Sequence, residues 1–111
     1  MNLLDLNTHE AFKMLTIIED ENRPVSGLEC CDLLSWVMAN GKENEAWITV
    51  QIHSNIVAVA TLLDFSCVII PESIEVDEEV VEKAKEEGLT IFSTALDAYG
   101  IFKVFYEHDK A

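Results

Sequence analysis

Glycine and proline, the residues that most often interrupt regular structure, are scarce in this sequence. There are four glycines and two prolines among 111 residues, whereas half of the residues are hydrophobic. This composition excludes an intrinsically disordered chain, although the formal net charge is −14. The length suits one folded domain across residues 1–111, because two separate hydrophobic cores need a longer chain, and the pattern is least defined over residues 1–21.

Basic residues are also few, with seven lysines and arginines against 21 aspartates and glutamates. Nucleic acids and anionic membrane surfaces are bound through clustered lysine and arginine, so the composition argues against both as partners. A membrane-spanning helix needs about 18 or more apolar residues. The longest candidate, residues 56–65, is interrupted by Thr61 and Asp64. The N-terminus carries Asp5 and Glu10 without a basic region, which is not the pattern of a secretion signal.

Paired cysteines are absent. Cys30, Cys31 and Cys67 are odd in number, and their spacing contains no C-x-x-C pattern. We therefore expect free thiols in or beside the core of a cytoplasmic protein, because disulfides are rare in that compartment. The alternative is a thiolate metal site that also recruits His53, but no ligand spacing supports it, and we expect neither a metal nor a cofactor.

The motifs of common enzymes are missing as well. The four glycines form neither a P-loop nor a G-x-G-x-x-G phosphate cradle, and the three histidines show no H-x-x-x-H or H-E-x-x-H spacing. A Cys–His nucleophile, whose members pair only in space, is the one catalytic interpretation left open. We therefore predict a protein without catalytic activity.

From residue 46 onward, short apolar strands alternate with helical patterns. Strands are predicted at 46–52, 67–70 and 89–93, and helices at 56–63, at 78–87 and from Thr94 through Tyr106. Such alternation is typical of right-handed β-α-β crossovers and a parallel sheet. We predict an α/β fold, a three-layer α/β/α sandwich around a mostly parallel sheet of four to five strands.

Local signals define the remaining elements. We predict a short helix at 2–7, a strand at 11–17, an extended segment that follows Pro24 and ends at Gly27, and a helix at 33–40. Thr94 with Asp97 forms the pattern of a capping box at the start of the last helix, and Gly88 suits the end of the helix before it. The helix at 56–63 is apolar almost all round, so we expect the sheet and a second subunit to cover it.

Ligands of open α/β sheets bind outside the carboxyl ends of the strands, which points to the turn after the strand at 46–52. The candidate ligand-binding residues in this turn are Gln51, His53, Ser54 and Asn55. Further candidates are Thr94 in the equivalent turn of a later strand, and Ser26, Gly27, Asp32 and Ser35 as a third wall.

Purely structural roles are open alternatives for several of these residues. His53 and Asn55 can serve only to cap the following helix, and Asp32 and Ser35 only to complement a helix dipole. No lysine or arginine lies within several residues of 51–55. A triphosphate held there by helix amides alone would bind weakly in a chain of this charge.

Several ordered blocks resemble the stand-alone DRTGG-domain proteins of bacteria. These blocks are residues 32–38, 46–51, 55–60, 67–70 and 76–79, and the resemblance extends over residues 22–107. The family is named for the motif Asp-Arg-Thr-Gly-Gly. The nearest stretch in this sequence is residues 22–28, where Leu28 stands in place of the second glycine.

The resemblance implies an α/β domain that self-associates and is often fused to CBS domains, pyrophosphatases or phosphotransacetylases. The family is also similar to the N-terminal domain of HPr kinase/phosphorylase. The kinase P-loop belongs to a different domain, which is absent from this sequence, so the resemblance does not imply serine kinase activity. It supplies no substrate, because the ligand of the family is not established.

We therefore predict a non-catalytic regulatory or interaction module that forms a homodimer. Its dimer surface would include the helix at 56–63 or the aromatic last helix. The alternative is a sensor of an adenine nucleotide or another small ligand, with a crevice at residues 51–55. The expected partners are a second copy of the chain, another protein or a nucleotide.

Overall fold

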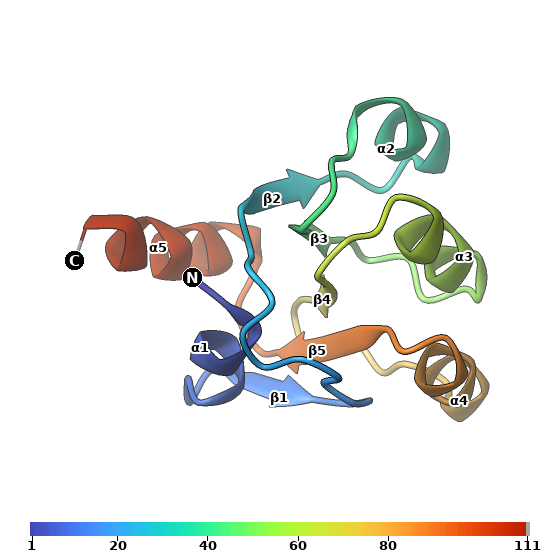
Figure 1. Cartoon of the computed structure of the whole chain (residues 1–111), viewed down its shortest axis with the longest axis horizontal. Helices are drawn as coiled ribbons and strands as arrows, with labels where there is room; N and C mark the ends of the chain where they lie inside the picture. Colours follow the sequence, from blue (N-terminus) through green and yellow to red (C-terminus); the bar gives the residue numbers. More distant parts are fainter. Residues whose placement is uncertain (111) are drawn as a thin grey trace.

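Four strands of the chain are each followed by a helix, and this alternation organises the fold. The structure is a computed structural model, and it describes residues 1–110 (Figure 1). The elements are α1 (Leu3–Asn7), β1 (Phe12–Met14), β2 (Gly27–Cys30), α2 (Leu34–Asn40), β3 (Glu45–Ile48), α3 (Asn55–Leu62), β4 (Cys67–Ile70), α4 (Glu78–Glu86), β5 (Thr90–Thr94) and α5 (Ala98–Lys110).

The strands form one sheet in the order β1-β5-β4-β3-β2. Strands β2 to β5 are parallel to one another, and β1 runs antiparallel to β5 at one edge. Helices α2, α3 and α4 cover one face, and α1 and α5 cover the other (Figure 1). Three successive right-handed crossovers in one direction place their helices on the same face. The predicted three-layer sandwich with a mostly parallel sheet is confirmed.

The pleat of each strand divides its side chains between two hydrophobic cores. In β4, Val68 and Ile70 belong to the core beneath α2, α3 and α4, whereas Cys67 and Ile69 belong to the core beneath α1 and α5. All four side chains are buried. The apolar run at 67–70 therefore reflects a central strand that is covered on both faces.

Helix α3 is the middle helix of its layer. Ile56, Val57, Val59 and Ala60 are buried, whereas its outer side carries the exposed Leu62. The helix packs against α2 on one side and α4 on the other, as well as against the sheet. The sheet covers one side as predicted, but the two neighbouring helices supply the further cover for which we expected a second subunit.

Three strand boundaries differ from the prediction by more than one residue, each for a local reason. Gly27 begins β2 instead of ending an extended segment, because it pairs with Glu45 of β3. Strand β3 ends at Ile48 instead of residue 52, because the Val50 amide beyond it donates to the Asp32 side chain and not to a neighbouring strand. Strand β1 is shorter than 11–17, because the Thr16 hydroxyl replaces part of the ladder and donates to the Leu89 carbonyl.

The start of the last helix also differs from the prediction. Helix α5 begins at Ala98, and the Asp97 carboxylate accepts a hydrogen bond from the Gly100 amide at 2.8 Å. Thr94 is instead the buried last residue of β5, and its hydroxyl accepts from the Leu96 amide at 3.1 Å. The predicted Thr94–Asp97 capping box is therefore wrong. Gly88 has a φ of +72°, which confirms that it terminates α4 in the left-handed conformation.

Among residues 1–110, no helix combines the length and apolar character that crossing a membrane requires.

Candidate functional site

The candidate ligand-binding residues lie at two opposite edges of the parallel sheet. The loops at the carboxyl ends of the strands contain Asp32, Gln51, His53 and Ser54, and Thr94 ends β5 at the same edge. Ser35 and Asn55 lie in the first turns of the helices that follow, α2 and α3. Ser26 and Gly27 lie at the amino end of β2. Because parallel strands share one direction, these two residues are separated from the turn at 51–55 by the length of the strands. The structure does not bring them into one crevice.

Asp32 connects the loops that follow β2 and β3. Its Oδ1 atom accepts hydrogen bonds from the Thr49 hydroxyl and the Val50 amide, both at 2.8 Å. The Gln51 side chain donates in return to the Asp32 carbonyl at 3.1 Å, and the Gln51 amide donates to Thr49 Oγ1 at 3.1 Å. The Asp32 side chain thus joins two loops at the carboxyl ends of the strands. It lies outside α2, which begins at Leu34.

His53 and Asn55 take up the capping arrangement. The Asn55 amide, at the first residue of α3, donates to His53 Nδ1 at 3.2 Å. Both residues are exposed, whereas Ser54 is half-buried and forms no side-chain cap bond. The imidazole therefore accepts from an amide that would otherwise be unpaired at the helix start.

The charge around this turn is of one sign. From residue 24 to residue 82, Lys42 is the only basic residue, and it lies in the turn before β3 at the opposite edge. The carboxylate of Asp32 is adjacent to the turn at 51–55. The negative charge beside this turn suits a neutral or cationic group better than a phosphate.

A separate cavity of about 500 Å³ opens at the same edge, between β1, β5 and α4. Lys13, Ser73 and Ser93 line it together with acidic residues of the loop before α4. Two neighbouring loop residues, Glu72 and Ser73, have positive φ. Their backbone amides donate hydrogen bonds to the Leu96 and Thr94 carbonyls, respectively, both at 2.9 Å. The cavity contains no residue of the turn at 51–55, and no sequence motif predicted it.

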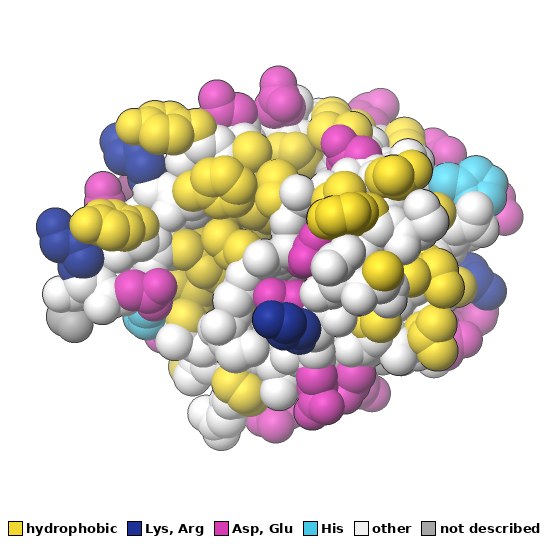
Figure 2. Space-filling model, turned by 90° about the horizontal axis from the view of Figure 1, so that it is seen from above, with side chains coloured by type: hydrophobic (Ala, Val, Ile, Leu, Met, Phe, Trp, Pro, Cys, Tyr) yellow, Lys and Arg dark blue, Asp and Glu magenta, His cyan; other side chains and the backbone are white. Residues whose placement is uncertain are grey.

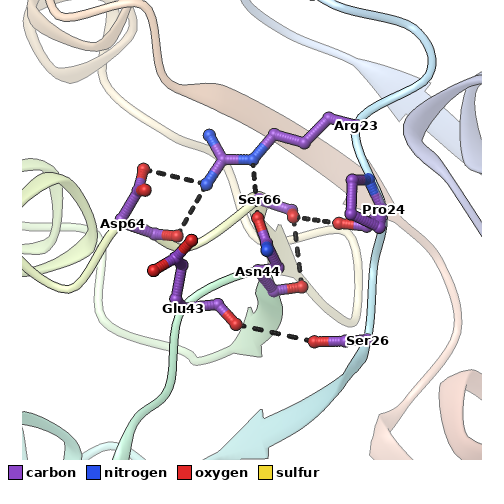
Figure 3. Close-up of polar contacts among 7 residues, drawn as sticks. All are labelled: Arg23, Pro24, Ser26, Glu43, Asn44, Asp64 and Ser66. Carbon is purple, nitrogen blue, oxygen red and sulfur yellow. Dashed lines mark hydrogen bonds and ion pairs between the residues drawn. The ribbon is translucent and has the colours of Figure 1, made fainter.

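Arg23, the only arginine of the chain, holds the opposite edge together (Figure 3). Its Nη2 atom donates to the Asp64 carbonyl at 2.6 Å and to Asp64 Oδ1 at 2.9 Å, and its Nε atom donates to Asn44 Oδ1 at 3.2 Å. The Ser66 hydroxyl donates to the carbonyls of Pro24 and Asn44. These bonds join the segment before β2 to the turns before β3 and β4.

This Arg23 cluster includes the stretch nearest to the DRTGG motif. Arg23 and Ser26 belong to residues 22–28, and the Ser26 amide donates to the Asn44 carbonyl at 2.9 Å. The contacts therefore assign the stretch a structural role. Our sequence analysis did not single out Arg23, although a lone arginine in a chain of charge −14 was a usable signal.

An exposed aromatic stripe runs along α5. Tyr99, Phe102 and Tyr106 are 70%, 41% and 62% exposed, and their spacing of three and four residues places them on one helix face. The Nζ atoms of Lys103 and Lys110 lie 5.8 and 5.3 Å from the ring centres of Tyr99 and Tyr106. Figure 2 shows apolar side chains gathered over the side of the molecule that carries α5, with lysines at the margin.

Two of the three cysteines, Cys67 and Cys30, are poor nucleophiles. Burial raises the pKa of the Cys67 thiol to about 12. Partial burial, followed by the negative charge of Asp32, raises the pKa of the exposed Cys30 thiol. Thiols act as nucleophiles in the thiolate form, so neither environment activates a cysteine at neutral pH. Within residues 1–110, no group of three His, Cys, Asp or Glu side chains is arranged to hold a metal ion.

Comparison with known proteins finds a likeness in fold. No protein-family model matches the sequence, and no curated protein matches it. The structure is similar to the CBS and DRTGG domains of the regulatory region of Clostridium perfringens pyrophosphatase, solved in complex with the activator diadenosine tetraphosphate. The TM-score is 0.70 and the sequence identity is 19%, over 92% of this chain and 43% of that chain. The likeness shows the fold alone. The chain thus spans less than half of that regulatory region.

Proposed function

We propose that this chain is a non-catalytic regulatory module that works as a homodimer, joined along the aromatic stripe of α5. The observation that carries the proposal is the exposure of Tyr99, Phe102 and Tyr106 on one face of a 13-residue helix. The opposite face of α5 is already used, because Ile101 and Phe105 are buried in the core against the sheet. The stripe is therefore not needed to hold the helix in place.

The stripe is nearly symmetric about its middle residue. In an antiparallel pairing of two α5 helices, Phe102 lies opposite Phe102 of the second copy, and each Tyr99 lies within one residue of a Tyr106, an offset of about 1.5 Å along the helix. Such self-complementarity is what an interface with two-fold symmetry requires. Fully burying one Phe-sized side chain contributes roughly 1.5–3 kcal/mol, so several of them offset moderate charge repulsion.

Two further features support the proposal. The fold is similar to part of the regulatory region of a pyrophosphatase, which is a regulatory and not a catalytic segment. Lys103 and Lys110 lie beside the tyrosines, so the stripe brings positive charge to a contact between two acidic copies. The resemblance of the sequence to DRTGG-domain proteins, which self-associate, points the same way.

Sedimentation equilibrium at micromolar concentration tests the proposal. We expect twice the monomer mass of 12.5 kDa for the wild type. Phe102→Asp places a charge at the centre of the stripe and is expected to give a monomer. The matched control is Leu62→Asp, because Leu62 is 69% exposed on α3, in the other helix layer. A monomeric wild type, or equal loss of the dimer in both variants, would contradict the proposal.

A nucleotide-sensing function is the second candidate. It is favoured by one observation, that the structure with a similar fold was solved with a dinucleotide activator. The candidate contacts are Gln51 and His53, although the nearby Asp32 carboxylate opposes phosphate binding. A ligand at 100 times its Kd stabilises the folded state by about 2.7 kcal/mol, which thermal melts resolve.

Melts with ATP, ADP, AMP and diadenosine tetraphosphate, each with magnesium, test this function. A stabilisation that disappears in His53→Ala with Gln51→Ala would support the turn at 51–55 as the site. Stabilisation that disappears only in Lys13→Ala would place the ligand in the 500 Å³ cavity instead. No shift with any nucleotide at millimolar concentration would remove the nucleotide function.

A further inference from the structure

A second apolar surface lies at the start of α2 and is distinct from the stripe on α5. Leu33, Trp36 and Val50 are 63%, 57% and 44% exposed, and we call these three residues the α2 surface. Leu33 and Trp36 are one turn apart, since the Trp36 amide donates to the Leu33 carbonyl at 3.0 Å. Val50 lies near the start of α2, because its amide donates to the side chain of Asp32, the residue before Leu33, at 2.8 Å.

The fold does not require these side chains for its own stability. Helix α2 is anchored on the sheet by Val37, which is fully buried. The two tryptophans illustrate the contrast. Trp47 is fully buried and donates from its indole nitrogen to the Cys31 carbonyl at 2.9 Å, whereas Trp36 is mostly exposed. An exposed tryptophan among other apolar side chains is typical of the centre of a protein–protein contact.

The charge around the α2 surface identifies the chemistry of its partner. Asp32 precedes Leu33, and Glu29 lies on the adjoining edge strand β2. Partial burial, and then the neighbouring Glu45, raises the pKa of Glu29, whereas the nearby Lys42 lowers it. Figure 2 shows apolar side chains among uncoloured ones over the part of the molecule in which α2 lies, with a few acidic side chains beside them.

A second copy of the chain is a poor partner for this surface. Each copy has a net charge of −14, and its residues 24–82 contain Lys42 as their only basic residue. Two α2 surfaces facing each other would bring acidic residues together, with Lys42 as the only lysine of residues 24–82 to offset them. The stripe on α5 differs in this respect, because Lys103 and Lys110 accompany its tyrosines.

We infer that the α2 surface binds a basic amphipathic segment of another protein. The apolar side of that segment covers Leu33, Trp36 and Val50, and its lysines or arginines lie against Asp32 and Glu29. This inference does not depend on the α5 dimer, because the two surfaces use different elements and opposite charge.

Trp36 itself reports the binding. The probe is a synthetic amphipathic peptide of leucine and lysine, with a leucine–glutamate peptide of the same pattern as the charge control. We expect the leucine–lysine peptide to shift Trp36 emission to shorter wavelength and to protect it from acrylamide at physiological salt. Trp47 is buried in both states, so it contributes a constant signal.

Variants separate specific docking from general attraction to an acidic protein. Leu33→Ser and Glu29→Gln are each expected to weaken peptide affinity about fivefold or more, the range of a residue that matters in an interface. Phe102→Ser, in the stripe on α5, is the control and should leave the affinity unchanged. Circular dichroism verifies that each variant is folded.

Three results would overturn the inference. Unchanged affinity in Leu33→Ser and Glu29→Gln would show nonspecific attraction to the net charge. Equal binding of the leucine–glutamate peptide would show that the surface does not select basic partners. Protection of Trp36 that rises with protein concentration in the absence of peptide would show that a second copy covers the surface.

Discussion

At the scale of single residues, the side chain of Asp32 fixes the chain directly after β3. Asp32 is exposed, yet its Oδ1 atom accepts two hydrogen bonds from the loop after β3. From the sequence alone, a carboxylate at the end of a strand is predicted to be a ligand-binding group. In the structure the same group fixes the path of the chain between β3 and α3.

Replacement of Asp32 tests this role. Asp32→Ala leaves the Thr49 hydroxyl and the Val50 amide without their acceptor, which is expected to lower the free energy of unfolding by about 1–3 kcal/mol. Asp32→Asn retains an oxygen at Oδ1 and should lose less. Urea denaturation measures both variants, with Ser35→Ala on the exposed side of α2 as the control. An alanine variant as stable as the wild type would show that the loop needs no such acceptor.

The buried thiol of Cys67 predicts a dependence of stability on alkaline pH. Its pKa rises from the ordinary value of 9.0 to about 12 in the folded state. The unfolded chain therefore loses the thiol proton first, so the stability contribution is complete below pH 9.0 and is lost between pH 9.0 and 12. Urea midpoints at neutral and alkaline pH should fall more steeply for the wild type than for Cys67→Ala. Equal slopes would mean that Cys67 ionises as readily in the folded state.

At the scale of elements, one side chain joins three segments at the amino edge of the sheet. Arg23 connects the segment before β2 with the turns before β3 and β4, through Asn44 and Asp64. Both turn residues have positive φ, at +67° and +56°, a conformation that asparagine and aspartate tolerate. The bonds from Arg23 help to hold these turns and thereby set the start of two strands.

Loss of the guanidinium should therefore destabilise the edge as a unit. Arg23→Ala is expected to lower the free energy of unfolding by about 1–2 kcal/mol, since part of the interaction is exposed to solvent. Arg23→Lys should restore little, because one ammonium group does not reproduce the two separate donors Nε and Nη2. Hydrogen exchange would report the effect as faster exchange of the β3 and β4 amides. A lysine variant with wild-type protection would show that charge alone suffices.

At the scale of the whole molecule, the net charge of −14 is spread unevenly. Residues 24–82, which form β2, β3 and β4 and most of the three-helix layer, contain a single lysine. Lys103 and Lys110, in contrast, both lie on α5. Self-repulsion of this kind destabilises a compact state and opposes assembly. The two exposed apolar surfaces consequently differ in the partners that they suit.

Salt should therefore stabilise both the fold and the proposed dimer. Raising the ionic strength from about 0.01 M to about 0.1 M shortens the screening length from about 30 Å to about 10 Å, so repulsion between exposed carboxylates weakens. Thermal melts in sodium chloride are expected to show a melting temperature that rises over this range. The Glu29→Gln variant, with one carboxylate fewer, should begin from a higher melting temperature at low salt. A melting temperature that falls with salt would show that attractive ion pairs dominate.

The periodicity of the chain was sufficient to predict the layers of the fold. It did not predict which distant elements and side chains become neighbours. Short apolar strands such as Cys67–Ile70 and the helices between them predicted a mostly parallel sheet, because a strand covered on both faces has few polar residues. The same logic overestimated the need for a partner at α3, because nothing in a linear pattern shows that α2 and α4 flank it. The stripe on α5 was visible as aromatic spacing, but only its exposure shows that it is unused by the core.

Composition and periodicity by themselves determined an acidic chain with an α/β fold and without the motifs of known phosphate-binding enzymes, since these properties depend on local spacing and burial. Tertiary structure alone decided that Ser26 and Gly27 lie opposite the turn at 51–55, that Asp32 and Arg23 hold the two edges, and that Trp36 is exposed while Trp47 is buried. These facts depend on strand order and on contacts between residues distant in the chain, and the side-chain pattern of a single segment carries no information about either.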